Sequence, residues 1–237
     1  MYTEKVKNKV REMIFNEAVD NLTKNRDKST ITSLEYFDAV EHFMLNDSSH
    51  PEDHILAGQL EPETKEAWKK HFTSILSSKK AAELRVAYLA GPNPENDLKE
   101  LCKLGVLPEN IWAFESQNKL YVDAIRNLLK TYPQVKIHKG KIDVFFENTA
   151  VNFDIVYLDF CGTFFSSNKE NKSIATIISL LDNHRLNSPG VLITNFAFLD
   201  NDNSSEMRSL VAKVVALYLY PKDYADMGLS AQEQGLG

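Results

Sequence analysis

The sequence predicts an α/β fold with a mostly parallel sheet and helices on both faces, preceded by a helical amino-terminal region. From Arg85 onward, short apolar runs alternate with helical patterns, and such alternation is typical of parallel strands joined by right-handed crossovers. The run 153–160 is apolar throughout its middle, 155–158, as expected for a strand that is buried on both faces. Before Arg85 the apolar residues recur at helical spacing only.

The composition is that of an ordinary globular chain. Its 237 residues are 43% hydrophobic and 10% aromatic, which suffices for one large domain with a helical addition. No apolar run approaches the roughly 18 residues of a membrane span, and the residues after Met1 form an amphipathic pattern instead of an apolar leader. Cys102 and Cys161 are the only cysteines, so a disulfide framework is excluded. We therefore expect a cytoplasmic protein.

The balance of charges limits the ways in which this chain can bind nucleic acid. A net charge of −6 and a pI near 5.6 exclude a basic surface that covers the whole molecule. The net charge does not exclude a local basic patch, because lysines gather within 69–85 and again within 136–141. The simpler interpretation of these lysines is that they lie on solvated helices and loops.

Residues 1–82 are predicted to be helical. The first helix carries an apolar stripe that recurs every four residues, at Val6, Val10, Ile14, Ala18 and Leu22. A second helix follows the capping-box spacing of Thr32 and Glu35, and a third is expected from about 61 to 82.

The remaining chain is predicted to alternate strands and helices. The strands are expected at 85–90, 111–115, 135–138, 153–160 and 190–196. The helices are expected at 97–104, 118–131, 174–181 and 204–218. Gly105 is a stop signal for the first of these helices, and Cys161-Gly162 predicts a tight turn after the fourth strand. We accordingly divide the chain into a helical cap (1–82), an α/β domain (83–220) and a tail (221–237).

Small or acidic residues follow the predicted strands. Ala90-Gly91-Pro92-Asn93 follows the first strand, Glu115 ends the second, and Asp159 lies at the end of the fourth. Ligands of open α/β sheets bind at the carboxyl ends of the strands. A carboxylate 24 residues after a small-residue loop suits a ribose diol, because it accepts two hydrogen bonds.

The first loop also predicts a helix start. Asn93 is suited to the cap position and Pro94 to the first helical position, so the helix would aim its amino terminus at an anionic group.

This order of motifs resembles the class I S-adenosylmethionine-dependent methyltransferases over about residues 84–198. The resemblance implies a Rossmann-like fold, S-adenosylmethionine as cofactor and no metal. It also implies that the helical cap covers the cofactor or grips the acceptor. By position, it assigns cofactor-binding roles to Ala90, Gly91, Asn93, Glu115, Asp143 and Asp159, and catalytic roles to Asp159 and Phe160.

The segment 159–162 is similar to the Asp-Pro-Phe/Tyr-Gly turn of RNA guanine-N2 methyltransferases, although it lacks the proline. That similarity implies that Asp159 holds an amino group and Phe160 stacks on a base. The acceptor is then a nucleobase amino group or another nitrogen. Cys161 is not expected to be a nucleophile, because the charge of Asp159 would raise the pKa of its thiol.

Several features depart from the family and leave a second hypothesis open. Gly91 is a lone glycine, and Pro92 and Pro94 remove two N–H donors, so the loop also fits a plain strand-to-helix turn. Asp159 could equally have a structural role, in which its side chain caps the turn that follows. The chain after Leu217 is too short for the antiparallel hairpin that completes the family's sheet. Either the sheet is truncated, the chain is a fragment, or a partner completes the sheet. The alternative is a non-catalytic methyltransferase-fold scaffold or a nucleotide-binding subunit of a larger complex. The expected partners are a nucleic-acid or small-molecule acceptor, with no membrane.

Overall fold

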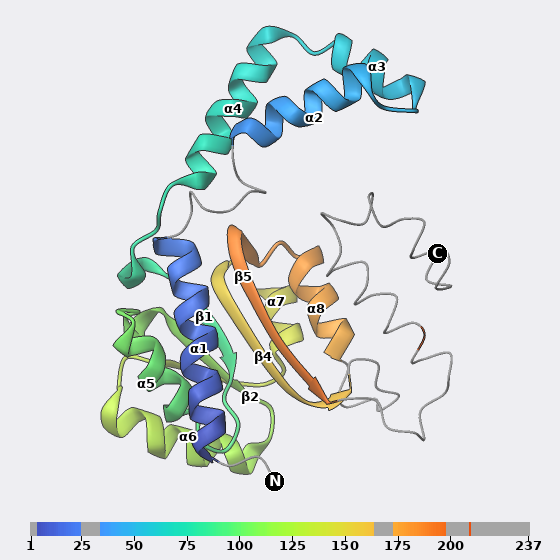
Figure 1. Cartoon of the computed structure of the whole chain (residues 1–237). Helices are drawn as coiled ribbons and strands as arrows, with labels where there is room; N and C mark the ends of the chain where they lie inside the picture. Colours follow the sequence, from blue (N-terminus) through green and yellow to red (C-terminus); the bar gives the residue numbers. More distant parts are fainter. Residues whose placement is uncertain (1–3, 25–33, 164–172, 198–208, 210–237) are drawn as a thin grey trace.

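The computed structural model describes residues 4–24, 34–163, 173–197 and 209, and it contains an α/β fold with an appended group of helices (Figure 1). The α-helices are α1 (Glu4–Thr23), α2 (Leu34–Asn46), α3 (Pro51–Gly58), α4 (Pro62–Leu76), α5 (Glu95–Lys103), α6 (Asn118–Thr131), α7 (Ile142–Asn148) and α8 (Ser173–Asp182). The strands are β1 (Val86–Leu89), β2 (Ile111–Glu115), β3 (Lys136–Lys139), β4 (Phe153–Thr163) and β5 (Leu186–Ala197). Short 3-10 turns at Ala81–Glu83 and Pro108–Asn110 precede β1 and β2.

The five strands form one parallel sheet in the order β3-β2-β1-β4-β5. Val86 of β1 pairs with Ile111 of β2 on one side and with Ile155 of β4 on the other. The prediction that the first strand is central, between the second and the fourth, is therefore confirmed. The order matches the 3-2-1-4-5 order of Rossmann-like sheets, as expected.

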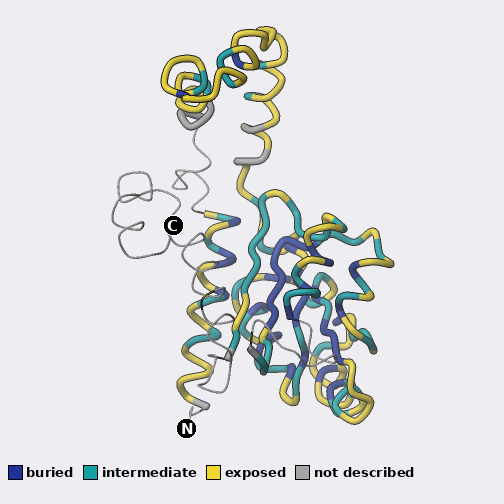
Figure 2. Tube along the Cα trace, turned by 90° about the vertical axis from the view of Figure 1, so that its right-hand side faces the viewer, coloured by how far each residue is buried: buried dark blue, intermediate teal, exposed yellow. Residues whose placement is uncertain are grey.

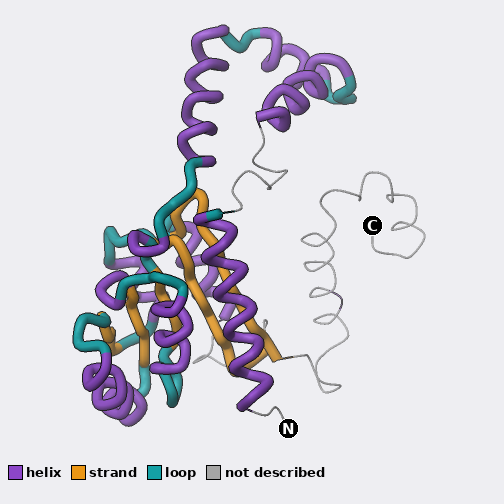
Figure 3. The backbone as a smooth tube through the Cα atoms, turned by 60° about the vertical axis from the view of Figure 1, so that its left-hand side comes forward, coloured by secondary structure: helices purple, strands orange, loops and turns teal. Residues whose placement is uncertain are grey.

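Side chains alternate between the two faces of the sheet, and each face has its own helical layer. Tyr88 and Tyr157 point to the face covered by α1, α5 and α6, where they join one buried cluster. Ala87 and Val156 point to the face covered by α7 and α8 and join a second cluster. Figure 3 shows α1 lying along the sheet, and Figure 2 shows that the buried residues concentrate inside the α/β part and are few in the helices that extend from it.

The helix after β1 begins and ends close to its predicted positions. Gly105, at φ +90°, follows the last turn of α5, and the N–H groups of Gly105 and Val106 donate to the carbonyls of Cys102 and Leu101. This is the expected glycine stop. The predicted cap is wrong by one residue: Pro94, not Asn93, occupies the cap position, because α5 starts at Glu95.

Other element boundaries differ from the prediction. The tight turn at Cys161-Gly162 is wrong, because β4 continues past a bulge to Thr163, which pairs with Ala197 of β5. The short helices α3 and α7 were not predicted, since one or two turns carry too little periodicity to be recognised. The third amino-terminal helix ends earlier than expected, at Leu76. The predicted helix 204–218 lies outside the described residues except for Ser209.

The amino-terminal helices occupy two different places. Phe15, Ala18, Val19 and Leu22 of α1 are buried in the cluster with β1 and β4, so α1 is a layer of the α/β unit. The division of the chain into cap, domain and tail stays a prediction.

The helices α2–α4 extend beyond the amino ends of the strands (Figure 1). Apolar side chains of these helices, such as Trp68 and Phe43, are exposed. Among all the described α-helices, none is long and apolar enough to cross a membrane. The connection from α4 enters β1 at the amino end of that strand. The expectation that the cap covers the cofactor or grips the acceptor stays a prediction.

Asp154 fixes this connection. Its carboxylate is buried at the start of β4 and accepts hydrogen bonds from three directions. Lys79 Nζ donates at 2.5 Å, the backbone N–H of Arg85 at 2.7 Å and the amide of Asn187 at 2.8 Å. The carboxylate thereby joins the segment after α4, the start of β1 and the start of β5.

We predict that Asp154→Ala lowers the free energy of unfolding by roughly 3 kcal/mol, because it removes the charged partner of Lys79 and the acceptor of two further donors, while Lys79 keeps only its bond to the carbonyl of Pro189. Urea denaturation followed by circular dichroism measures the change. Asp154→Asn keeps one acceptor oxygen and should lose less, and Glu52→Ala, at an exposed position of α3, serves as a surface control. A loss no greater in Asp154→Ala than in the control would contradict the proposed role.

Candidate functional site

The site expected from the sequence lies at the carboxyl ends of three neighbouring strands. The Gly91 loop follows β1, Glu115 ends β2, and Asp159 lies near the end of β4. Since β1 pairs with both β2 and β4 in parallel, these residues lie at one edge of the sheet.

The first loop is held by contacts on both of its sides. Ala90 is buried and its N–H donates to the carbonyl of Phe114 at 2.9 Å. Gly91 has φ +59°, and a Cβ at this position would meet nothing within 4 Å, so the loop has open space beside it but a left-handed backbone. The buried hydroxyl of Tyr88 donates to the carbonyl of Pro94 at 2.9 Å, and Asn93 is exposed.

Glu115 is buried, and only one of its two carboxylate oxygens accepts a hydrogen bond from a described residue. The residue is 7% exposed, and Oε1 accepts a hydrogen bond from the N–H of Gln117 at 2.7 Å. No described residue donates to Oε2. The N–H of Gly140 donates to the backbone carbonyl of Glu115 at 3.0 Å and brings the turn after β3 beside it. Asp143 follows this turn in the first turn of α7.

Asp159 and Phe160 point to opposite faces of β4. Asp159 is exposed, and its Oδ1 accepts a hydrogen bond from the amide of Asn195 on β5 at 2.8 Å. Phe160 packs against the cluster on the α7/α8 side and stacks on Phe196, with ring centroids 5.6 Å apart. The two adjacent side chains are therefore separated by the alternation of the strand, and one face of the Phe160 ring is already covered.

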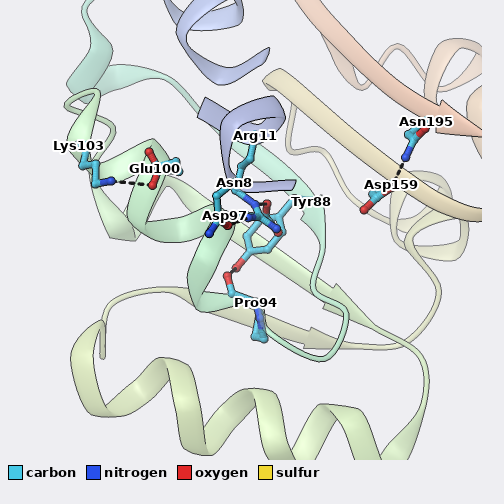
Figure 4. Close-up of polar contacts among 9 residues, drawn as sticks. All are labelled: Asn8, Arg11, Tyr88, Pro94, Asp97, Glu100, Lys103, Asp159 and Asn195. Carbon is cyan, nitrogen blue, oxygen red and sulfur yellow. Dashed lines mark hydrogen bonds and ion pairs between the residues drawn. The ribbon is translucent and has the colours of Figure 1, made fainter. Parts of the chain in front are cut away.

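A polar cluster that the sequence did not predict lies between the first loop and α1 (Figure 4). Arg11 Nε contacts Asp97 Oδ1 at 2.5 Å, and both side chains are largely buried. Burial raises the pKa of Asp97 to about 6, with Arg11 opposing the shift and the charges of Asp159 and Glu95 adding to it. The geometry alone would suggest a low pKa beside a guanidinium, but the loss of solvent outweighs that attraction.

Two further groups border this cluster. Burial, followed by the charges of Asp159 and Asp97, raises the pKa of the Tyr157 hydroxyl, which stays a hydrogen-bond donor at neutral pH. Glu95 Oε2 is buried and accepts no hydrogen bond from any described residue. A buried carboxylate oxygen without a donor is unusual and marks a place that suits a cationic or N–H group.

The sequence analysis did not identify Tyr157, Asp97 or Arg11 as site residues. Sequence patterns could have pointed to the first two but not to the third. Tyr157 precedes Asp159 by two residues, so the strand period places both on one face. Asp97 lies in the first turn of the helix after the Gly91 loop. No sequence pattern points to Arg11, because 86 residues separate it from Asp97. Within the described residues, no three His, Cys, Asp or Glu side chains gather in a way that would hold a metal ion.

Comparisons with known proteins find similarity to methyltransferase structures only at a distance. No family model matches the sequence, and no curated protein matches it. The SAH-bound methyltransferase of Podospora anserina is 11% identical, with a TM-score of 0.38 over 89% of this chain and 81% of that chain. An O-methyltransferase family protein of Burkholderia thailandensis is 13% identical, with a TM-score of 0.38 over 89% of this chain and 58% of that chain.

The raised pKa of Asp97 predicts a pH dependence of stability. The carboxyl binds its proton more tightly in the folded state than in the unfolded state, where its pKa is near 3.8, so this contribution is full at low pH and is lost as pH rises through about 6. A shift of this size corresponds to roughly 3 kcal/mol of free energy of unfolding.

We therefore expect wild type to lose stability relative to Asp97→Asn between pH 4 and pH 7. Urea denaturation at unit steps of pH measures the difference, with Asp182→Asn on α8 as an exposed control that should follow wild type. A difference between wild type and Asp97→Asn that stays constant over this range would refute the assignment.

Proposed function

We propose that this protein is an S-adenosylmethionine-dependent methyltransferase. The observation that carries the proposal is the placement of the partly used, buried carboxylate of Glu115 beside the left-handed Gly91 loop, at the carboxyl ends of β2 and β1. A ribose diol requires such an acceptor beside a close approach of the backbone.

The residues at this edge fit the cofactor. Glu115 Oε2 is free to accept a ribose hydroxyl, and the open space at Gly91 admits the methionine part beside Ala90 and Asn93. The orphaned Oε2 of Glu95 suits the ammonium group of that part. Asp143, three residues after Gly140, is the candidate for the adenine.

The cofactor, when bound, supplies a methyl group on a sulfonium, and in-line transfer of that group requires no metal. The protein then contributes position and exclusion of water. Asn195 orients Asp159 by donating to Oδ1, and the Tyr157 hydroxyl is a second hydrogen-bond partner of this carboxylate. Tyr157 lies on the same face and supplies a neutral O–H donor.

The acceptor that we propose is a nucleobase amino group or another nitrogen. Asp159 is exposed at the edge, and an ionised carboxylate accepts more than the hydrogen bonds of Asn195 and Tyr157, so it suits an N–H donor. Phe160 points to the other face of β4 and stacks on Phe196, so in this proposal Asp159 alone contacts the acceptor and the expected stacking role of Phe160 is left out.

Glu115→Ala should weaken S-adenosylmethionine binding roughly tenfold to a hundredfold, the effect of losing a charge-assisted hydrogen bond. Isothermal titration calorimetry measures the affinity. Glu109→Ala is the matched control, because this exposed glutamate lies just before the other end of the same strand. Equal affinities in the two variants would remove Glu115 from the site.

Asp159→Ala should abolish methyl transfer while donor affinity stays within a few-fold, because the proposed partner of Asp159 is the acceptor. Transfer of a radiolabelled methyl group to nucleic acid measures the activity. Cys161→Ser should keep most activity, since the thiol has no covalent role in the proposal. Full turnover in Asp159→Ala would leave this carboxylate as a structural partner of Asn195.

The second candidate is a non-catalytic methyltransferase-fold scaffold or nucleotide-binding subunit. The first loop favours this second candidate. Pro92 and Pro94 lack N–H groups that could bind a cofactor, and the carbonyl of Pro94 already accepts a hydrogen bond from the hydroxyl of Tyr88. No side chain caps α5. Calorimetry with S-adenosylmethionine and with its demethylated product decides between the two: a protein that binds neither is a scaffold.

A further inference from the structure

Lysines gather around an open groove between α1 and α5. The groove has a volume of about 500 Å³ and is lined by polar side chains, Lys5, Asn8, Lys9, Glu12, Asn96, Lys99, Glu100 and Lys103. Four lysines around one groove contrast with the net charge of −6 of the whole chain.

The lysines form two rows. Lys5 and Lys9 are four residues apart on α1, and Lys99 and Lys103 are four residues apart on α5, so each pair shares one face of its helix. The two members of a row are about 6 Å apart along the helix axis. The rows face each other closely enough that Glu12 of α1, after Glu100, contributes to the raised pKa of Lys103.

Most of the positive charge in the groove is not neutralised by the protein. Lys103 Nζ pairs with Glu100 at 2.7 Å. Lys5, Lys9 and Lys99 are exposed and form no ion pair with another described residue. Glu12 is the one remaining acid among the lining residues, so cations exceed anions in the groove.

The groove borders the candidate site. Asn96 precedes Asp97, and Asn8 Oδ1 accepts a hydrogen bond from Arg11 at 2.6 Å (Figure 4). A ligand in the groove therefore lies next to the Arg11–Asp97 pair and the start of α5, at the side of the Gly91 loop.

We infer that this groove binds the phosphodiester backbone of a single nucleic-acid strand. Two rows of unpaired ammonium groups at intervals of one helical turn suit a ligand with repeated anionic groups, and lysines bind phosphates as point charges. The amide groups of Asn8 and Asn96 add donors of a type that contacts phosphate and sugar. The acidic remainder of the surface confines a polyanion to the groove.

The inference rests on the proposed function only in naming the class of acceptor, because strand binding itself requires no methyl donor. Fluorescence anisotropy with labelled 16-nucleotide single-stranded RNA and DNA tests it over a range of KCl concentrations. We expect binding whose log affinity falls linearly with log salt, by about 0.7 for each phosphate contact.

The decisive comparison is between two double variants with equal change of net charge. Lys5→Glu/Lys99→Glu removes one unpaired lysine from each side of the groove and should weaken binding at least tenfold and flatten the salt slope. Lys70→Glu/Lys130→Glu changes exposed lysines on α4 and α6 and should stay within twofold of wild type. Comparing the affinities for the RNA and the DNA strand shows which backbone the groove prefers.

Equal losses in the two double variants would overturn the inference, as would displacement of the strand by polyglutamate of equal length at equal concentration. Titration of S-adenosylmethionine into the groove variant separates this result from the methyl-donor proposal. Strand binding without donor binding contradicts the proposed function alone, and donor binding without strand binding contradicts the groove alone.

Discussion

The structure depends on the burial of β1 between two parallel neighbours and two helical layers. Val86, Ala87 and Tyr88 are fully inaccessible to solvent, so their backbone polar groups must be satisfied by β2 and β4. Parallel pairing then aligns the carboxyl ends of three strands. The loop at Gly91 lies between Glu115 and Asp159 for this reason, and the location of the site follows from the order of the strands.

The carboxylates at the two ends of the sheet differ in how fully the protein satisfies them. At the amino end, Asp154 accepts three hydrogen bonds and ties separate segments together. At the carboxyl end, Glu115 accepts one hydrogen bond at its carboxylate, and Glu95 has a buried oxygen with no donor among the described residues. The first arrangement stabilises the fold. The second costs stability, and such under-satisfied groups are typical of a place that a ligand completes.

Helix α1 links the core to the candidate site. Its Phe15 packs edge-on against Tyr157 with ring centroids 5.3 Å apart, and Arg11 pairs with Asp97 at the start of α5. The same helix forms one wall of the lysine groove. A change in the packing of α1 would therefore alter three things together: the buried face of the sheet, the protonation of Asp97 and the position of the groove beside the Gly91 loop.

The sequence alone determined the alternation of strands and helices, the stop at Gly105, and the location of Glu115 at the end of a strand. These features depend on periodicity and turn chemistry, which neighbouring residues carry. Only the tertiary structure decided that α2–α4 extend from the amino edge, that β4 continues to Thr163 along β5, and that Arg11 meets Asp97. Such contacts join residues far apart in the chain, and their partners are chosen by how the layers pack rather than by local sequence.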